Sequence, residues 1–208
     1  VDPVTAQVTT IAGTGTLGGA DNSNPLLATF GYITAVAADS AGNVYVLEND
    51  GAKSRLRKIG YDSTANAYGP VTTLVSTTQN LTIGEGLLVA QDGSGLYFTT
   101  QTDLRKFTFS NSQVSVVANV AGNLSYAPNG DILVSGYTSI YRVTTQGQVT
   151  IPSEVTPVVG AYTNILQLAN GYFVRGDGEF NLDVITAAGG RRVYAGSGGS
   201  TELPGLDK

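Results

Sequence analysis

Oxygen-bearing side chains are the residues of this chain whose types and spacing could support chemistry. Glu85, Asn123 and Asn164 each lie near the start of an expected strand, at matching positions in a repeated pattern. Carboxylate and amide oxygens bind hard cations such as Ca²⁺ or Mg²⁺. If the strands that carry them meet at one axis, the three side chains would form a metal site. The alternative interpretation is that these polar residues line a water-filled channel.

The amino-acid composition excludes most other catalytic chemistry. The 208 residues include no Cys, His, Met or Trp. Without His there is no Ser-His-Asp triad and no HExxH zinc site. Without Cys there is no thiol nucleophile, disulfide or Cys-ligated metal. We therefore favour a protein that is not an enzyme and has no cofactor, with Ca²⁺ as the one candidate ion.

Charge and hydropathy exclude two classes of partner. The chain has 11 Lys and Arg against 16 Asp and Glu, a net charge of −5. Nucleic acids bind clustered basic residues, so no nucleic-acid partner is expected. No apolar run approaches the roughly 20 residues of a membrane helix, so no membrane insertion is expected. Abundant Thr, Ser, Asn and Gly with few Lys favour an extracellular location or the surface of a cell or particle.

A second candidate site is the tripeptide Arg175-Gly176-Asp177, which has the sequence recognised by integrins. Alignment of the repeats places it in a turn between two strands, where Glu48–Gly51 lies in the first repeat. At an exposed loop tip, the cation and the carboxylate would both project and could mediate cell adhesion. Asp and Gly are also common turn formers, so the tripeptide has an ordinary structural explanation as well.

Two other motifs are interpreted as structural. Residues 13–18 match G-x-G-x-x-G, which opens a helix in nucleotide-binding folds, but a turn-rich loop follows here. A recurring basic strip lies on expected third strands and consists of Arg55, Arg57, Lys58, Arg105 and Lys106. We expect this strip to be a solvated face that discourages edge pairing, with contact to an acidic partner as the alternative.

Three recurring phrases define the elements that must position these residues. A strand of the Val-Thr-Thr type recurs at a mean spacing of about 46 residues, beginning at Val8, Val71, Val114, Val149 and Arg191. A short strand, a polar turn and an alternating apolar strand recur around residues 37–46, 89–98, 125–134 and 166–174. A third strand begins at Leu56, Leu104, Ile140 and Leu182. Each unit therefore has four strands, and no segment has helical periodicity.

Four antiparallel strands repeated at this interval are typical of a β-propeller. The phrases Val-Thr-Thr-Ile-Ala-Gly-Thr-Gly, Ala-Val-Ala-Ala-Asp-Ser-Ala-Gly-Asn-Val-Tyr-Val and Arg-Leu-Arg-Lys-Ile resemble an NHL repeat, and the later units are degenerate but in phase. The resemblance implies an all-β propeller of four-stranded antiparallel blades. The stretch Gly84–Gly93 also resembles the opening of gluconolactonase-type propellers, whose Glu binds a catalytic metal. That family needs an Asn and an Asp on later blades, and an axial Asp is not evident here.

The resemblance also predicts the blade boundaries. Four blades are expected at residues 33–76, 84–119, 121–153 and 162–196, with residues 1–13 as the outer strand of a preceding blade. Because the chain begins and ends in the same phase of the repeat, we expect it to be part of a larger propeller. The alternative is a compact four-bladed ring whose first strand packs elsewhere.

The function expected from these observations is that of a non-catalytic, extracellular, NHL-like module. Its partner would be another protein, or further copies in an assembly, and its loops would present the recognition surface. Two alternatives stay open. One is a metal-dependent, gluconolactonase-like hydrolase that uses Glu85, Asn123 and Asn164. The other is cell adhesion through Arg175, Gly176 and Asp177.

Overall fold

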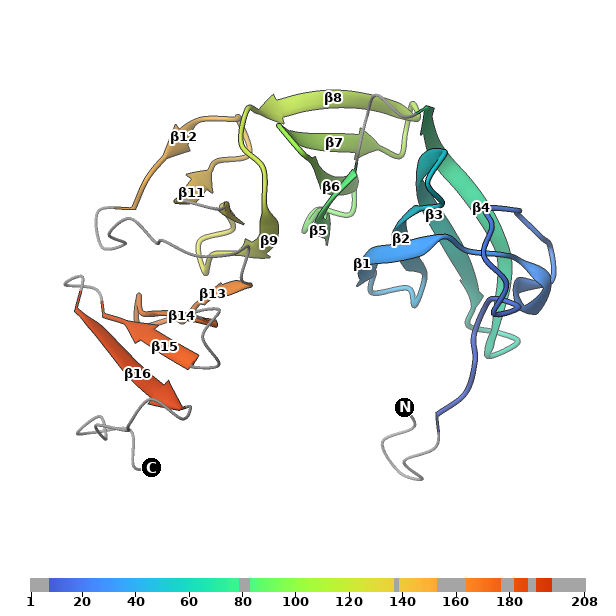
Figure 1. Cartoon of the computed structure of the whole chain (residues 1–208), viewed down its shortest axis with the longest axis horizontal. Coiled ribbons are helices and arrows are strands. Elements are labelled where there is room, and N and C mark those ends of the chain that lie inside the picture. Colours follow the sequence, from blue (N-terminus) through green and yellow to red (C-terminus); the bar gives the residue numbers. More distant parts are fainter. Residues whose placement is uncertain are drawn as a thin grey trace. The chain divides into compact units, whose positions relative to one another are not determined.

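The computed structural model of the chain describes residues 8–78, 83–136, 139–152, 164–176, 182–186 and 190–195. These residues form sixteen β-strands in four antiparallel four-stranded sheets (Figure 1) and one short 3₁₀ helix, η1 (Pro25–Leu27). The described residues contain no α-helix, and none of their helices is long and apolar enough to cross a membrane. The expectation of an all-β fold built from four-stranded sheets is confirmed. The chain divides into two compact units, Val1–Ile83 and Gly84–Lys208.

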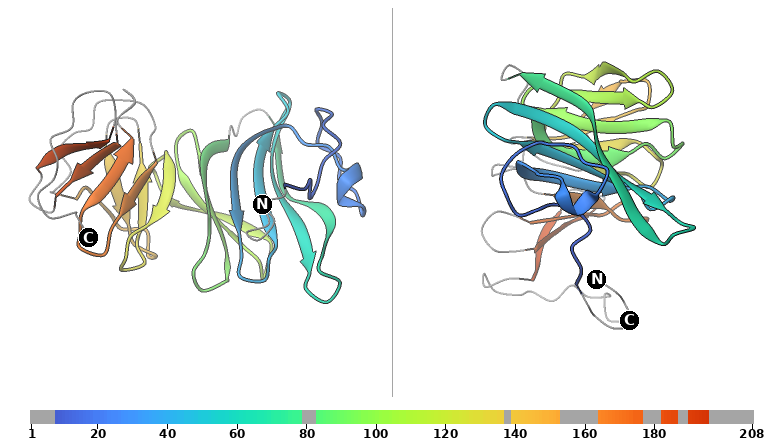
Figure 2. Two further views of the ribbon diagram at one scale, coloured as in Figure 1. Left: turned by 90° about the horizontal axis from the view of Figure 1, so that it is seen from below. Right: turned by 90° about the vertical axis from the view of Figure 1, so that its right-hand side faces the viewer.

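The first unit contains one sheet, with its strands in the order β1-β2-β3-β4. These strands are β1 (Tyr32–Ala38), β2 (Val44–Asn49), β3 (Lys53–Asp62) and β4 (Ala67–Thr78). The β3–β4 hairpin is long and strongly twisted (Figure 2). Residues 8–13, the described part of the expected additional outer strand, form no strand. A strand requires a ladder of hydrogen bonds to a neighbour, and the backbone N–H of Gly13 instead bonds the Pro25 carbonyl in the loop that follows.

The second unit contains three sheets, each with its strands in chain order. The first of them consists of β5 (Ile83–Val89), β6 (Gly95–Thr100), β7 (Leu104–Thr108) and β8 (Gln113–Ala118). The next consists of β9 (Asn123–Tyr126), β10 (Ile132–Ser135), β11 (Ile140–Val143) and β12 (Val149–Thr150). The last consists of β13 (Ile165–Gln167), β14 (Phe173–Gly176), β15 (Leu182–Ile185) and β16 (Arg191–Ala195).

The polar turn between the first and second strands is built on a left-handed glycine in all four sheets, and the turn between β5 and β6 is one residue longer than the others. Each turn contains a glycine with φ between +69° and +88°, and these are Gly42, Gly93, Gly130 and Gly171. The N–H of each glycine bonds a carbonyl three residues earlier. Glycine adopts this left-handed conformation without the Cβ clash that other residues meet. The repeated Asn, Asp and Gly of the sequence therefore fix four equivalent hairpins.

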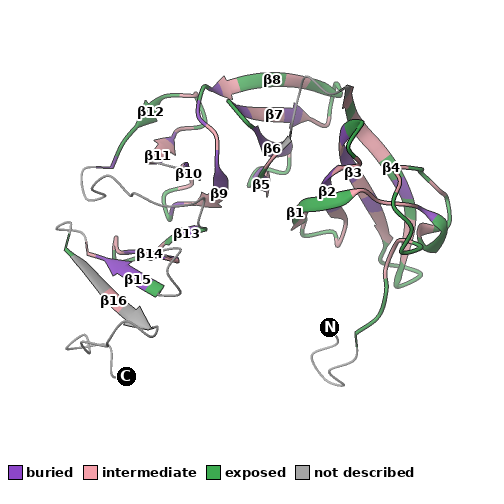
Figure 3. Ribbon diagram, in the orientation of Figure 1, coloured by how far each residue is buried: buried purple, intermediate pink, exposed green. Residues whose placement is uncertain are grey.

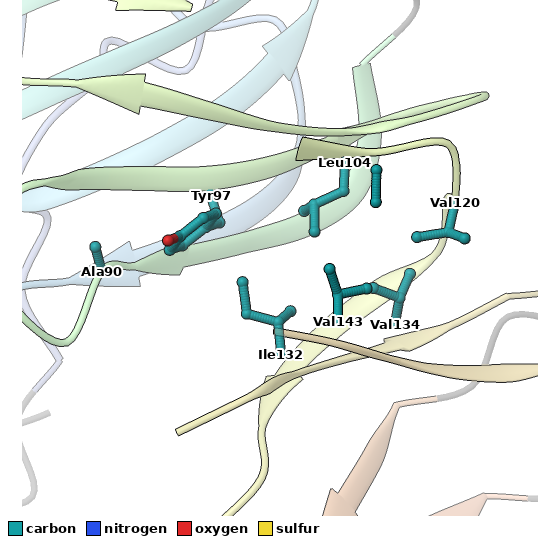
Figure 4. Close-up of a cluster of buried hydrophobic side chains, with 8 residues drawn as sticks. Ala90, Tyr97, Leu104, Val120, Ile132, Val134 and Val143 are labelled. Atoms are coloured by element: carbon teal, nitrogen blue, oxygen red, sulfur yellow. The ribbon is translucent and has the colours of Figure 1, made fainter. Parts of the chain in front are cut away.

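Neighbouring sheets of the second unit pack face to face through alternating apolar residues. Tyr97 and Leu104 project from one sheet and meet Ile132, Val134 and Val143 of the next in one buried cluster (Figure 4). In an antiparallel pair, residues directly opposite each other share a face. The other face of the β9–β12 sheet carries Leu133 and Ile140, which pack against Ile165, Phe173 and Ile185 of the last sheet. The β9–β12 sheet thus has one face for the preceding sheet and one for the following sheet.

Candidate functional site

The three predicted metal ligands lie at the starts of the first strands of the sheets in the second unit. Glu85 is exposed on β5, Asn123 is the buried first residue of β9, and Asn164 directly precedes β13 and is exposed. Across the described part of the chain, no group of three His, Cys, Asp or Glu side chains is placed to hold a metal ion. Asn123 is only 8% exposed.

Strand alternation directs the side chains of Glu85 and Asn123 to different places. A Cβ on Gly86 would lie 2.5 Å from Cγ of Leu124, so the side-chain direction of Gly86 points at the next sheet. Glu85 precedes Gly86 and therefore faces away from that sheet. Leu124 packs against the cluster shared with the β5–β8 sheet, so Asn123 faces the opposite way, towards the last sheet. The alternation therefore favours an arrangement in which the side chains of Glu85 and Asn123 do not face the same metal ion.

The hydroxyl of Thr99 joins two adjacent sheets beside these residues. Its Oγ1 accepts a hydrogen bond from the Gly86 N–H at 3.1 Å and donates one to the Gly122 carbonyl at 2.9 Å. Thr99 has no exposed surface. The missing side chain of Gly86 permits this close approach, because its Cβ would lie 2.6 Å from the Gly122 oxygen. Thr99 is therefore a structural link between β5 and the start of β9.

The expected loop position of Arg175 and Gly176 is corrected by the structure. Both residues belong to strand β14, and Arg175 is only 6% exposed. Its Nη2 lies 3.3 Å from Oδ2 of Asp183 on the neighbouring strand, where the two residues form a directly opposed pair. Asp177 lies outside the described residues. A buried, ion-paired Arg175 does not provide the projecting cation that adhesion through this tripeptide requires.

The strongest polar network of the described residues lies in the first unit and is centred on Arg57. Its Nη1 donates to Oε1 of Glu48 at 3.1 Å and to the Thr29 carbonyl at 2.6 Å, and its Nη2 donates to Oδ1 of Asp21 at 2.9 Å. The guanidinium also lies 4.6 Å from the centroid of the Phe30 ring. Arg57 and Glu48 are both completely buried. The expectation of a solvated basic strip is wrong for Arg57, because the segment that precedes β1 covers it.

This network attaches the segment before β1 to one face of the first sheet. Ala28 of the segment is fully buried against Val46, Ile59 and Val71 of the sheet, and Ile11, Ala12 and Phe30 pack around them. Oε2 of Glu48 accepts the N–H of Gly31 at 2.9 Å, immediately before β1 begins. Apolar burial and buried charge–dipole bonds therefore fix the path of the chain into β1.

A second charge cluster stabilises the turn at the end of β2. Oδ1 of Asp50 accepts the N–H groups of Lys53 and Ala52, and its Oδ2 lies 2.8 Å from Nη2 of Arg55. These bonds, led by the one from Lys53, lower the pKa of Asp50 to about 2. Arg55 also reaches Oε1 of Glu48 at 3.5 Å. The turn cluster is thus continuous with the buried network.

An open groove borders this fixed segment. It has a volume of about 620 Å³ and is lined by residues 10 and 12–17 on one side and by Phe30, Gly31 and Ile33 on the other. Leu17 and Ile33 expose 55% and 51% of their surfaces here. Val36 and Ile33 share a face of β1, because their partners Val46 and Glu48 lie on one face of β2. Val36 is 59% exposed. We call Leu17, Ile33 and Val36 the β1 surface; β1 is drawn mostly in the colour of exposed residues in Figure 3.

Sequence reasoning missed the β1 surface and the Arg57–Glu48 pair. A signal for the pair was present, because Glu48 continues the alternation of Val44 and Val46 on the inward face of β2. Arg57 lies opposite Val46 in the register of β3 and so faces the same way. A charged residue at an inward position of an alternating strand predicts a buried partner.

No protein-family model and no curated protein sequence matches this chain. Solved structures do match. Virginiamycin B lyase from Staphylococcus aureus aligns with a TM-score of 0.58 and 16% identity over 84% of this chain and 56% of the lyase. A chain of the nidogen/laminin complex aligns with a TM-score of 0.60 and 16% identity, over 79% of this chain and 65% of that chain. A gluconolactonase from Xanthomonas campestris aligns with a TM-score of 0.50 and 12% identity, over 68% of this chain and 52% of the lactonase.

These likenesses, at low identity, show the fold: the chain is a β-propeller protein whose four sheets are blades. The chain spans between about half and two thirds of the length of the matched proteins. Two of the three are enzymes and one belongs to a protein complex. The feature they share is therefore the propeller and not one chemistry.

Proposed function

We propose that this chain is an NHL-like propeller module that acts outside the cell by binding a protein and performs no catalysis. The observation that carries the proposal is the β1 surface: Leu17, Ile33 and Val36 expose more than half of their area beside an open groove. Contiguous exposed apolar side chains on a folded domain mark interaction surfaces. An exposed apolar strand next to a groove suits another polypeptide better than a small polar substrate.

The network around Arg57 supports this proposal because it holds the groove in shape before any partner arrives. Glu48 fixes Gly31, and Arg57 fixes Thr29 and Asp21, so the segment on one side of the groove is attached to the sheet on the other. A preformed surface loses little conformational entropy on binding. The buried charges therefore have a positioning role here and need no catalytic one.

The other parts of the proposal rest on composition and comparison. The absence of His and Cys removes imidazole bases and thiol nucleophiles. The surface residue types favour an extracellular location, and one solved match belongs to the nidogen/laminin complex. The NHL-like character rests on the Val-Thr-Thr and Arg-Leu-Arg-Lys phrases of the first blade.

Selection from a displayed library of strand-forming peptides tests the proposal. We expect peptides that bind the wild-type chain to lose binding to the Ile33→Asp variant, by tenfold or more for about 1.4 kcal/mol of lost contact. Val116→Asp is the matched control, because Val116 is equally exposed, at 54%, but lies on the outer strand β8 of the second unit. A role for the β1 surface would be refuted if the selected peptides bound both variants with the same affinity as the wild-type chain.

A second candidate, the metal-dependent gluconolactonase-like hydrolase, is favoured by one observation. Asn123, only 8% exposed, places an amide oxygen at the start of β9, and such oxygens bind Ca²⁺. Glu85 would be the charged ligand and Asn164 the third, binding Ca²⁺ as a Lewis acid for a lactone carbonyl. The alternation of Glu85 and Asn123 weighs against this candidate, and a calcium titration separates the two functions.

A further inference from the structure

The third strands of the four blades carry one equivalent apolar residue whose exposure changes along the chain. Leu56 and Leu104 are fully buried and Ile140 is 2% exposed, but Leu182 is 37% exposed. Leu104 and Ile140 are buried because each faces the following blade of the second unit. Leu182 occupies the same position on the fourth blade.

The fourth blade has a second exposed leucine on the same face. Leu166 lies opposite Val174, and Gly176 lies opposite Leu182, so both leucines share the face of Val174. Phe173 and Ile185 are on the other face, against the third blade. Leu166 is 52% exposed. The pair Leu166 and Leu182, here called the β15 surface, therefore occupies the face that a following blade covers elsewhere in the second unit.

The β1 surface is the counterpart of the β15 surface. Val36 is paired with Val46. Val46 in the first blade and Val134 in the third blade occupy equivalent positions, because each lies three residues after the end of its hairpin turn. Val134 faces the preceding blade, together with Leu124 of the first strand. Ile33 and Val36 thus lie on the face of the first blade that a preceding blade covers elsewhere, in the part of that face that the segment before β1 leaves exposed.

We propose that a second copy of this chain packs against these two blades, so that the β15 surface of one copy contacts the β1 surface of another. The contact would continue the blade-to-blade packing already present in the second unit. The five residues of the two surfaces carry no charge, so they can meet without like-charge repulsion between chains of net charge −5. The interface is head-to-tail, because the two surfaces differ. This inference rests on the proposed protein-binding function and names its partner.

A mixing experiment tests the head-to-tail geometry. We expect sedimentation velocity of the wild-type chain to show concentration-dependent species heavier than 21.4 kDa. Val36→Asp removes one surface and Leu166→Asp removes the other, so we expect each variant alone to associate at least tenfold more weakly. An equimolar mixture of the two should recover dimers, because each pair retains one intact β1 surface and one intact β15 surface. Val116→Asp should associate like wild type.

Three results would overturn the inference. They are a wild-type chain that stays monomeric at the highest attainable concentration, a mixture that fails to recover dimers, and a Val36→Asp variant that still associates like wild type. Circular dichroism and urea midpoints confirm that the variants are folded, as expected for substitutions at exposed positions. If the wild type is monomeric while displayed peptides still require Ile33, self-association fails and the proposed protein-binding function stands. If no selected peptide requires Ile33, the proposed function itself fails.

Discussion

Nη1 of Arg57 donates a hydrogen bond to Oε1 of Glu48 at 3.1 Å, and neither side chain has any exposed surface. The pair is directly coupled to the groove, since Glu48 also binds the N–H of Gly31 and Arg57 binds the Thr29 carbonyl. Nε of Arg57 has no hydrogen-bond partner among the described residues, and its guanidinium lies over Phe30. Removal of either member would take from the other its fully buried charged partner and leave only the weaker or more exposed ion pairs with Arg55 and Asp21.

The Arg57→Met variant should therefore destabilise the first unit by about 3–5 kcal/mol, because Glu48 would stay buried without its main partner. Urea unfolding monitored by tyrosine fluorescence measures the loss, and hydrogen exchange of residues 10–31 should accelerate. The double variant Arg57→Met/Glu48→Leu should recover most of the stability, since it removes both charges.

Asp21→Asn is the matched control for this pair. Asp21 accepts from Arg57 and from the N–H of Thr73, but its side chain is 44% exposed. We expect this variant to lose no more than about 1 kcal/mol, because an exposed ion pair is screened by water and Asn keeps an acceptor oxygen. Equal losses in Asp21→Asn and Arg57→Met would contradict a special role for burial.

The bridge through Thr99 gives a prediction for the second unit. Thr99→Val keeps the shape of the side chain but leaves the Gly86 N–H and the Gly122 carbonyl without their buried partner. We expect a loss of about 1–3 kcal/mol in the free energy of unfolding. Thr99→Ser keeps the hydroxyl and should lose clearly less. The bridge is refuted if the valine variant is as stable as wild type.

The repeat pattern of the sequence predicted the blades because it reports local geometry. A turn that requires a positive φ selects glycine, and this explains Gly42, Gly93, Gly130 and Gly171. A strand whose side chains alternate between the two faces of a sheet gives the alternating pattern of residues. The repeat alignment placed Arg175 in a turn because it matched the tripeptide to Glu48–Gly51, but Glu48 and Asn49 are the last residues of β2 (Val44–Asn49), as Arg175 and Gly176 are of β14 (Phe173–Gly176). Local sequence patterns do not determine the residue at which a strand ends, because that end depends on hydrogen bonds to the neighbouring strand.

The polar sites were harder to predict because they depend on contacts between distant residues. Arg57 meets Thr29 and Asp21, 28 and 36 positions earlier in the chain. No periodicity indicates that a loop will cover the basic strip of β3. Likewise, the repeat alignment placed Glu85 one residue before and Asn123 one residue after a common level, whereas the facing directions of their side chains depend on the contact of Gly86 with Leu124.

The carboxyl of Asp50 should make stability depend on acid. Its pKa falls from the model-peptide value of 3.8 to about 2 in the folded chain, chiefly through the Lys53 N–H and then through Arg55. A lowered folded pKa adds stability that is complete above 3.8 and is lost as the pH falls towards 2. In Asp50→Asn we expect a shallower fall of the urea midpoint between pH 4 and pH 2. Above pH 5 the difference between variant and wild type should be constant, and a pH-independent difference throughout would contradict the assignment.

Calcium provides the test that separates a binding module from a metal-dependent hydrolase. We expect CaCl₂ and EDTA to leave the melting temperature unchanged, because Gly86 points at Leu124 and Glu85 consequently faces away from the sheet that carries Asn123. Glu85→Gln should then melt like wild type with and without calcium, and neither protein should hydrolyse simple lactones. A calcium-dependent rise in melting temperature that both Glu85→Gln and Asn123→Ala abolish would reverse this conclusion. It would require the two strand ends to turn towards one ion, against the alternation of β5 and β9.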